Sequence, residues 1–343
     1  MAQKRGKIMA KVSVLGAGGW GIGIAVLLNN NGHQVTIWSA VDREVEMLKE
    51  KRENTISLPG IVIDENIKIT NNLNEAIDDE DIIVMAVASS FVRSTSAKLK
   101  GLIKDGQIIV NVAKGIEEET LMTLTDIIKQ EVPNADVAVL SGPSHAEEVG
   151  RGIPTTCVVG ADTKKTAELL QNVFSSPVFR VYTSPDVLGI ELGGALKNVI
   201  ALAAGIVDGL GYGDNTQAAL LTRGIAEIAR LGVAMGAKPL TLYGLSGIGD
   251  LIVTCGSMHS RNRRAGILIG QGYSMSEAIK EVNMVVEGVY AAKSAKKLAA
   301  KYNVKMPIID TVNMVLFEGK NARDAVNELM VRDKTNENVD LDW

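Results

Sequence analysis

The stretch 184–209, SPDVLGIELGGALKNVIALAAGIVDG, is almost entirely apolar and predicts one long buried helix. Ser184 is a favourable N-cap, Pro185 suits the first helical turn, and Asp186 complements the positive helix end. Four glycines lie in its interior, and each costs about 1 kcal/mol relative to alanine there. We therefore expect other groups to approach the backbone of this helix closely.

Lys197 is the notable polar side chain of this stretch. In a helix its stem leans back over Gly193 and Gly194, so its amine would lie in a small pocket beside bare backbone. This indicates a functional lysine; the alternative is a lysine that extends to solvent beside glycines that only permit helix packing. A membrane span is not expected, because Glu191, Lys197 and Asp208 interrupt the apolar run.

Length and composition limit the possible classes of protein. A chain of 343 residues exceeds what one hydrophobic core usually serves, so we expect two domains, 1–184 and 185–343. The net charge of -4 argues against a nucleic-acid binder. Cys157 and Cys255 lie too far apart for a disulfide framework or zinc spacing, and the N-terminus lacks a signal-like apolar core. We expect a cytoplasmic protein without stable membrane insertion or bound metal.

Residues 11–15, KVSVL, predict a buried strand, and GAGGWG follows at once with Gly16, Gly18 and Gly21 in the GxGxxG positions. A helix and a second strand at 35–38 complete a βαβ unit. In this context a dinucleotide-binding turn is favoured over a purely structural one. Gly16 permits the turn, Gly18 lets a pyrophosphate approach, and the helix N-terminus supplies free N–H groups.

The residues after the second strand bear on the choice between NAD and NADP. No acid stands at the strand end to bind a ribose diol, and Asp42 is late enough to be a helix N-cap. Ser39 and Arg43 are able to accept a 2'-phosphate instead. This pattern favours NADP, or use of both dinucleotides.

Strand and helix patterns alternate in the first half, which predicts a mainly parallel sheet with ligands beyond the carboxyl ends of its strands. Three such ends carry candidate residues. Lys114 is expected over the cofactor cleft rather than in solvent, Phe91 either stacks near the cofactor or only packs, and 141–144 form a polar turn. The further predicted strands are 67–70, 81–87, 108–112, 137–140, 155–159 and 179–182, and the helices are 92–99, 118–131 and 164–174.

The second half has helical periodicity throughout, with a capping box at Ser274 and Glu277. The expected fold class is therefore α/β, a Rossmann-type mainly parallel sheet domain followed by an all-α C-terminal domain. The predicted helices after 209 are 215–235, 265–269, 276–282, 288–302, 307–317 and 322–330.

Two short segments of this half carry polar groups suited to a site. Asp250 and Thr254 are four residues apart, so they share one face of a short helix, where a carboxylate is able to hold and tune an amine. Ser260, Arg261 and Asn262 open the next helix and bring free N–H groups, a hydroxyl and a guanidinium together. This indicates a phosphate site; a solvated basic patch is the alternative.

Taken together, these motifs resemble the bacterial-type NAD(P)-dependent glycerol-3-phosphate dehydrogenases over essentially the whole length. The resemblance is carried, in chain order, by GAGGWG at 16–21, LPG at 58–60, AKG at 113–115, SGPS at 141–144, ELGGALKN at 191–198, GDN at 213–215, LTRG at 221–224, GDL at 249–251, SRNR at 260–263 and VVEG at 285–288.

The resemblance implies that Lys197, with Lys114 and Asp250, is catalytic. Lys197 would take the C2 hydroxyl proton while a hydride passes from C2 to the nicotinamide. The implied substrate contacts are Lys114, Gly142, Ser144, Lys197, Asp250, Ser260, Arg261 and Asn262, to which we add the adjacent Asn198 and Thr254 as candidates. The implied cofactor contacts are Gly19, Trp20, Lys114, Ala146, Arg261, Val285 and Glu287, besides Gly16, Gly18, Gly21, Ser39, Arg43 and Phe91.

The expected activity is interconversion of sn-glycerol 3-phosphate and dihydroxyacetone phosphate, with reduction as the physiological direction, feeding glycerophospholipid synthesis. The family also suggests a homodimer through the helical domain. His145, where Phe often stands, and Ala40, where a basic or polar residue often stands, depart from the pattern. The alternatives are a β-hydroxyacid dehydrogenase with a carboxylate substrate, or a non-catalytic dinucleotide sensor or scaffold.

Overall fold

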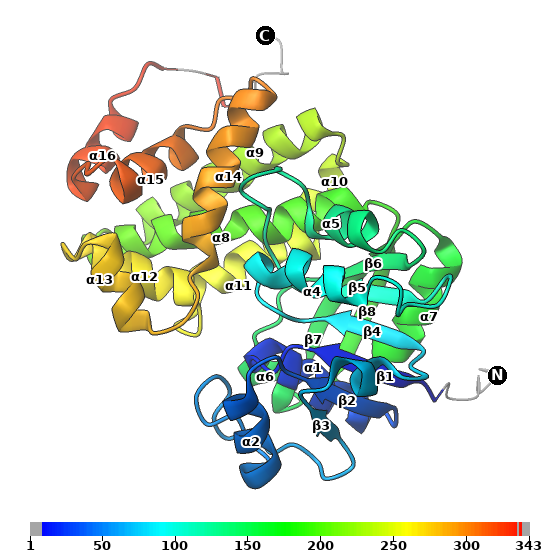
Figure 1. The fold of residues 1–343 in the computed structure, drawn as a ribbon. Helices are drawn as coiled ribbons and strands as arrows, with labels where there is room; N and C mark the ends of the chain where they lie inside the picture. Colours follow the sequence, from blue (N-terminus) through cyan, green and yellow to red (C-terminus); the bar gives the residue numbers. More distant parts are fainter. Residues whose placement is uncertain (1–8, 335, 338–343) are drawn as a thin grey trace.

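One eight-stranded sheet is present in the computed structural model, which describes residues 9–334 and 336–337 (Figure 1). The strand order is β3-β2-β1-β4-β5-β6-β7-β8, and all neighbours are parallel except β6 and β7. The predicted mainly parallel sheet is thereby confirmed; the first eight residues, used for the expected lack of a signal, lie outside the described part. The strands are β1 (Lys11–Leu15), β2 (Gln34–Trp38), β3 (Lys68–Thr70), β4 (Ile82–Met85), β5 (Ile108–Asn111), β6 (Asp136–Ser141), β7 (Thr155–Ala161) and β8 (Phe179–Ser184).

Helices cover both faces of this sheet. In β4, Val84 belongs to the apolar core under α1 and α7, whereas Ile83 and Met85 belong to the core under α4 and α5. Because both faces are buried, the central strands are apolar at almost every position. The helices of this half are α1 (Gly19–Asn30), α2 (Asp42–Lys51), α3 (Leu73–Ile77), α4 (Val92–Leu99), α5 (Leu124–Glu131), α6 (Ala146–Gly150) and α7 (Lys164–Phe174).

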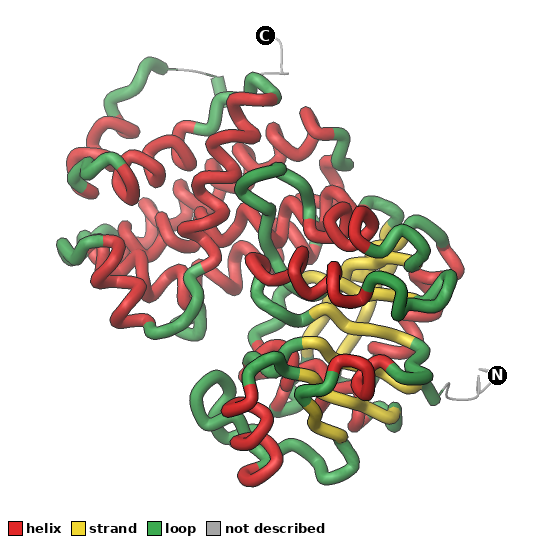
Figure 2. Tube along the Cα trace, in the orientation of Figure 1, coloured by secondary structure: helices red, strands yellow, loops and turns green. Residues whose placement is uncertain are grey.

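The remainder of the described chain is helical, and Figure 2 shows it gathered beside the sheet-containing half. The predicted capping box is present, since Ser274 and Glu277 each accept a hydrogen bond from the other's backbone N–H. The helices are α8 (Val187–Gly209), α9 (Asp214–Met235), α10 (Pro239–Leu242), a π-helical turn (Leu245–Gly249), α11 (Asp250–Gly256), α12 (Arg261–Gly270), α13 (Met275–Val282), α14 (Glu287–Lys301), α15 (Pro307–Phe317) and α16 (Ala322–Met330).

The glycines of α8 allow other backbones to touch it, as expected. A Cβ added at Gly193 would lie 2.7 Å from the carbonyl oxygen of Ser246. One added at Gly205 would overlap the carbonyl of Arg263 and lie 2.9 Å from the Cα of Gly266, so α12 crosses α8 in backbone contact. Within the described residues α8 is also the one helix long and apolar enough to span a membrane, yet its whole apolar window is buried in the protein.

The start of α8 differs from the prediction. Ser184 still pairs with Gly160 at the end of β8, and its hydroxyl accepts a hydrogen bond from the N–H of Asp186. Asp186 is the N-cap, because its carboxylate accepts from the N–H of Gly189 at 3.0 Å. The expected Ser184 cap was wrong because a longer strand uses that residue.

Two other helix starts were also misplaced. The helix predicted from 118 begins at Leu124, because Thr123 forms an isolated bridge with Ile116 and caps α5. Asp42 is the first residue of α2 rather than its N-cap, which is Val41. By contrast, the expectation that Ser260, Arg261 and Asn262 open a helix is confirmed, since α12 begins at Arg261 behind the Ser260 cap rather than at 265, where the apolar pattern starts.

Candidate active site

Lys197 projects from the buried middle of α8 and is held by α11. Its side chain is 8% exposed, and Nζ donates to Asp250 Oδ1 at 2.9 Å and to Thr254 Oγ1 at 2.6 Å. The Thr254 hydroxyl donates its own proton to the Asp250 carbonyl at 2.6 Å, so its oxygen is free to accept from the amine. The shared face of Asp250 and Thr254 is confirmed, and the alternative of a solvent-extended Lys197 is wrong.

Lys114 reaches the same carboxylate from the carboxyl end of β5. Its Nζ lies 2.5 Å from Asp250 Oδ2 and 3.0 Å from the carbonyl oxygen of Gly142. Its stem passes over Gly194 of α8, where an added Cβ would lie 3.5 Å from Lys114 Cγ. The bare backbone at Gly194 therefore admits a second lysine, and Asp250 bridges two ammonium groups.

This charge arrangement suits proton transfer. Burial, together with a smaller contribution from neighbouring Lys114, lowers the pKa of Lys197 to about 8, although Asp250 opposes the shift. Burial alone would raise the pKa of Asp250, but the two lysines outweigh it and hold that pKa below its usual range. An amine with a pKa near neutrality both accepts and donates a proton readily, as a general acid or base must.

The glycine-rich turn fits a dinucleotide. Gly16 has a φ of +126°, and an added Cβ would lie 2.7 Å from the backbone of Ala86, so only glycine is accommodated there. Among residues 9–334 and 336–337, nothing lies within 4 Å of an added Cβ at Gly18, and no side chain caps the N-terminus of α1. The buried indole N–H of Trp20 has no partner among the described residues. Open space and unpaired donors are what a pyrophosphate requires.

The predicted phosphate site forms at the N-terminus of α12. Ser260 is the N-cap and accepts from the N–H of Arg263 at 3.2 Å. Arg263 is used within the fold, since its guanidinium pairs with Asp208 at 2.7 Å. Arg261 is half-buried and makes no hydrogen bond to the described residues, and burial lowers its pKa. A partly desolvated, unpaired guanidinium at a helix N-terminus favours the anion site over a solvated patch.

Asn198 and Asn262 tie the helices around this site together. The Asn262 amide donates to Asn198 Oδ1 at 2.9 Å and accepts from the N–H of Gly288 at 2.8 Å. Both asparagines are buried. This chain of bonds fixes α8, α12 and α14 to one another, so Lys197 and Arg261 are presented from a rigid frame.

Glu287 lies between the glycine turn, where the cofactor is expected, and the two lysines. Its carboxylate accepts from the Ser89 N–H at 3.2 Å and the Ser89 hydroxyl at 2.5 Å, and burial raises its pKa. A Cβ added at Gly115, next to Lys114, would lie 3.8 Å from Glu287 Oε2 and against Ser89. The ends of β4 and β5 and the start of α14 thus converge between the glycine turn and the two lysines.

The SGPS turn, residues 141–144, contacts Lys114 and leads into a helix that packs on α1. Gly142 has a φ of +146°, and its carbonyl accepts from the Ser144 hydroxyl at 2.9 Å as well as from Lys114. Ala146 begins α6 and packs on α1, where an added Cβ at Gly23 would lie 3.3 Å from its carbonyl oxygen. We call Lys197, Lys114 and Asp250 together the lysine centre. The SGPS turn therefore joins the lysine centre to α1, the helix that follows the glycine turn.

The unusual His145 lies beside the lysine centre. Its Nε2 is 3.4 Å from the carbonyl oxygen of Val253, and its ring lies 5.7 Å from that of His259. Burial lowers the pKa of His145, and the charge of Lys197 adds to this effect. The ring is therefore held neutral more firmly than an ordinary histidine.

The remaining predicted cofactor residues lie outside the group formed by Lys197, Lys114 and Asp250. Phe91 is 58% exposed and Val285 is 37% exposed. Ser39 follows β2 and is buried, whereas Arg43 in α2 is exposed. These residues do not contact the lysine centre, as expected if they serve the outer parts of a dinucleotide.

Glu191 was missed as a candidate residue. It is buried in α8, accepts from the Thr125 N–H at 2.9 Å, and receives a weaker bond from the Asn111 amide at 3.4 Å. Asn111 also bonds the backbone N–H and carbonyl of Ala113, each at 3.1 Å, next to Lys114. The signal in the sequence was a single acid within an apolar run, which indicates a buried carboxylate with polar partners. Those partners, Thr125 and Asn111, lie 66 and 80 residues earlier in the chain.

A parallel sheet with a dinucleotide turn, facing a buried lysine and an unpaired arginine on helices, defines the class of dinucleotide-dependent dehydrogenases. Profiles described as NAD-dependent glycerol-3-phosphate dehydrogenase N-terminus and C-terminus match residues 11–167 and 186–327. The chain belongs to the NAD-dependent glycerol-3-phosphate dehydrogenase family.

Individual relatives agree with this assignment. A glycerol-3-phosphate dehydrogenase [NAD(P)+] of Fusobacterium nucleatum is 66% identical over 328 residues, covering 95% of this chain and 98% of the relative. One of Agathobacter rectalis is 63% identical over 335 residues, covering 98% and 100%. The crystal structure of glycerol-3-phosphate dehydrogenase from Coxiella burnetii has a TM-score of 0.91 at 34% identity, covering 94% and 99%.

Proposed function

We propose that this chain interconverts sn-glycerol 3-phosphate and dihydroxyacetone phosphate with NAD(P), using Lys197 as general acid and base. The observation that carries the proposal is the amine of Lys197, 8% exposed and bonded to Asp250 and Thr254, on the same helical frame as the unpaired Arg261. A buried proton donor beside an anion site suits a small phosphorylated ketone.

In the direction of reduction, Arg261, Ser260 and the N–H groups of α12 would hold the substrate phosphate. Protonated Lys197 would donate a proton to the C2 oxygen, and Asp250 would keep the amine oriented and stabilise its charged form. Lys114 would polarise the same oxygen. The nicotinamide cofactor supplies or accepts the hydride at C2 when bound. Glycerol 3-phosphate made this way would serve glycerophospholipid synthesis in the cytoplasm.

The test is oxidation of NADH or NADPH by the purified chain, followed at 340 nm with and without dihydroxyacetone phosphate. We expect oxidation only when the phosphate ester is present. No turnover with either cofactor would refute the proposal. A preference for a carboxylate ketone would favour the β-hydroxyacid dehydrogenase alternative, and tight NADH binding without turnover would favour a sensor.

We further propose a division into domains 1–184 and 185–343, supported by the change from β8 to α8 at this point. Each half has its own large apolar core. The sheet half would bind the dinucleotide and the helical half would supply Lys197, Asp250 and Arg261.

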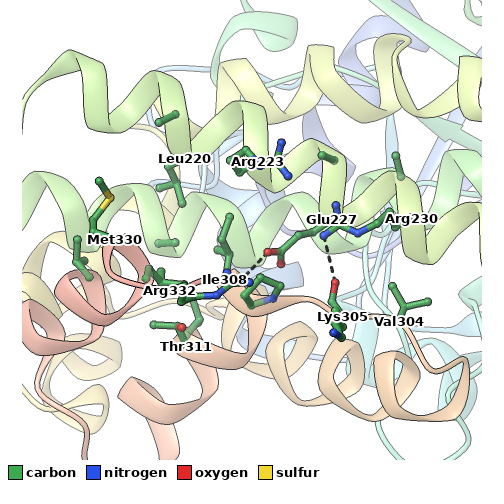
Figure 3. Close-up of a pocket in the computed structure, with 18 of the residues that line it drawn as sticks. Leu220, Arg223, Glu227, Arg230, Val304, Lys305, Ile308, Thr311, Met330 and Arg332 are labelled. Atoms are coloured by element: carbon green, nitrogen blue, oxygen red, sulfur yellow. Dashed lines mark hydrogen bonds between the residues drawn. The ribbon is translucent and has the colours of Figure 1, made fainter. Parts of the chain in front are cut away.

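We also propose a homodimer through the helical half. A groove of about 1440 Å³ is lined mainly by α9, α15 and α16. In Figure 3, Glu227 accepts from the Ile308 N–H and Arg230 donates to the Lys305 carbonyl within this groove. Large apolar side chains on its walls, Val233 and Met330, are 48% and 79% exposed. A second copy is the favoured occupant because an exposed apolar surface with charges of both signs on its walls suits a self-complementary interface.

Sedimentation at micromolar concentration tests the dimer. We expect a dimer for the wild type and at least about tenfold weaker association for Val233→Glu. Val62→Glu is the matched control, because Val62 is 71% exposed but lies in the sheet half. A monomeric wild type, or equal effects of the two variants, would contradict this interface.

A further inference from the structure

The carboxyl end of β2 holds a carboxylate that comes from a helix rather than from the strand. Glu44, in the first turn of α2, accepts a hydrogen bond from the Ser39 hydroxyl at 2.6 Å. Ser39 directly follows β2 and is 4% exposed. The acid that the strand end lacks in sequence is therefore supplied in space by Glu44.

Backbone contacts place Ser39 beside the glycine turn. The N–H of Gly16 donates to the carbonyl of Trp38, the last residue of β2, at 2.8 Å. The N–H of Ser39 donates to the carbonyl of Thr70 in β3 at 3.2 Å. Ser39 thus lies at the common edge of β1, β2 and β3, where a dinucleotide on this turn has its adenosine ribose.

The orientation of Glu44 leaves one carboxylate oxygen available. The Ser39 hydroxyl accepts from the Val41 N–H at 3.2 Å, so its own proton is directed to Glu44 Oε2. Oε1 makes no hydrogen bond within the described part of the chain, and Glu44 is partly exposed. The carboxylate is held at one oxygen and is open at the other.

In the first turn of α2 the charges besides Glu44 are one acid, Asp42, and one base, Arg43. Asp42 accepts from the Asn71 amide at 2.8 Å, which keeps a second negative charge on the same helix turn. Arg43 is exposed and makes no hydrogen bond to the described residues, so its charge is screened by water. Two fixed carboxylates therefore outweigh one solvated guanidinium near the ribose.

We propose that Glu44, positioned by Ser39, makes this enzyme select NAD over NADP. Its free oxygen accepts from the ribose diol, and its charge repels a 2'-phosphate. This reverses the NADP preference expected from Ser39 and Arg43, because the Ser39 hydroxyl already serves Glu44. The inference rests on the dinucleotide site of the proposed function but not on the identity of the substrate.

The test compares binding of NADH and NADPH, by quenching of tryptophan fluorescence, in the wild type, Glu44→Gln and Glu46→Gln. Glu46 is exposed on the same helix, so its variant is a control with the same change in net charge. We expect the wild type to bind NADH at least about tenfold more tightly than NADPH. Glu44→Gln should reduce that ratio about tenfold or more, mainly through tighter NADPH binding, and the effect should shrink at high salt.

Ser39→Ala should shift the ratio in the same direction by a smaller factor, because Glu44 loses its hydrogen bond but keeps its charge. A wild type that prefers NADPH, or equal ratios in Glu44→Gln and Glu46→Gln, would overturn the proposal. Binding is measured without turnover. A shifted binding ratio in a protein that fails to reduce dihydroxyacetone phosphate would therefore reject the proposed substrate and retain the role of Glu44.

Discussion

The glycine turn and the lysine centre are built in different ways. Gly16, Gly18 and Gly21 lie within one short segment of the sequence, and the turn is determined by the backbone conformation of a few residues. Lys197, by contrast, acquires its properties from two distant residues. Asp250 lies 53 residues after it, and Lys114 lies in the loop after β5. One region depends on local backbone shape, and the other depends on a balance of charges brought together by packing. Substitutions at the glycine turn should therefore impair dinucleotide binding, whereas substitutions at the lysine centre should impair catalysis.

Removing the amine should have the largest effect. Lys197→Met keeps an unbranched apolar stem but cannot carry a proton, so we expect kcat to fall by about a thousandfold or more. NADH binding should stay near the wild-type value, because the glycine turn is untouched. Single-turnover kinetics together with a binding titration measure both quantities. A variant with a near-normal rate would remove Lys197 from the mechanism.

Altering the glycine turn should instead abolish NADH binding. Gly16→Ala forces a Cβ to within 2.7 Å of the Ala86 backbone at a φ of +126°, so we expect loss of NADH binding and a loss of about 1–3 kcal/mol in stability. Gly18→Ala is the matched control: its φ of -70° is ordinary and its surroundings are open. It should weaken binding of the dinucleotide without changing the denaturation midpoint.

Equal loss of stability in Gly16→Ala and Gly18→Ala would contradict the role given to backbone conformation. Normal NADH binding by Gly16→Ala would contradict the placement of the cofactor on this turn. Circular dichroism on each variant separates a folded protein that does not bind from one that has unfolded.

Arg261 offers a smaller and more selective change. Arg261→Ala should raise KM for dihydroxyacetone phosphate by about ten- to a hundredfold, because a charge-assisted contact to phosphate is lost. Arg264→Ala, which changes a neighbouring cation on α12, should have less effect. The measurement is steady-state kinetics at saturating NADH. An unchanged KM would mean that the phosphate binds elsewhere.

Sequence reasoning was more successful for the glycine turn than for the lysine centre. The strand, the glycines and the following helix are neighbours, so their spacing alone indicates the turn. Asp250 was identified as a partner for an amine from its helical spacing with Thr254. Sequence spacing does not show, however, that this one carboxylate bridges Lys197 and Lys114. That arrangement depends on the packing of α11 against α8 and on the position of the loop after β5.

The errors have the same physical origin. Ser184 was assigned to a helix because serine caps helices, but its pairing with Gly160 keeps it in β8. No acid directly follows Trp38 in the sequence, but Glu44 reaches this strand end from the next helix and accepts from the Ser39 hydroxyl, which local spacing did not indicate. Local patterns predict which elements form, whereas hydrogen bonds between elements decide which side chains share a site.

Glu191 gives the smallest effect and links the two regions. Burial raises the pKa of this carboxyl to about 7, although its hydrogen bonds from Thr125 act against the shift. Between about pH 4.5 and 7 the folded chain retains a proton that the unfolded chain has released. The free energy of unfolding should therefore fall as pH rises through this window, by up to about 3 kcal/mol from this group.

Glu191→Gln should remove that part of the pH dependence, because the amide still pairs with Thr125 but does not titrate. Urea denaturation at pH 5 and pH 8 measures this effect as a smaller difference between the two free energies of unfolding than in the wild type.

Glu227→Gln is a matched comparison. Burial also raises the pKa of Glu227 to about 7, but this carboxyl lies within the helical half alone. If Glu191 joins the sheet to α8, only Glu191→Gln should also change the pH profile of kcat, because Asn111 donates to Glu191 and accepts from the N–H of Ala113, next to Lys114. Identical kinetic profiles for the two variants would mean that the lysine centre is independent of this junction.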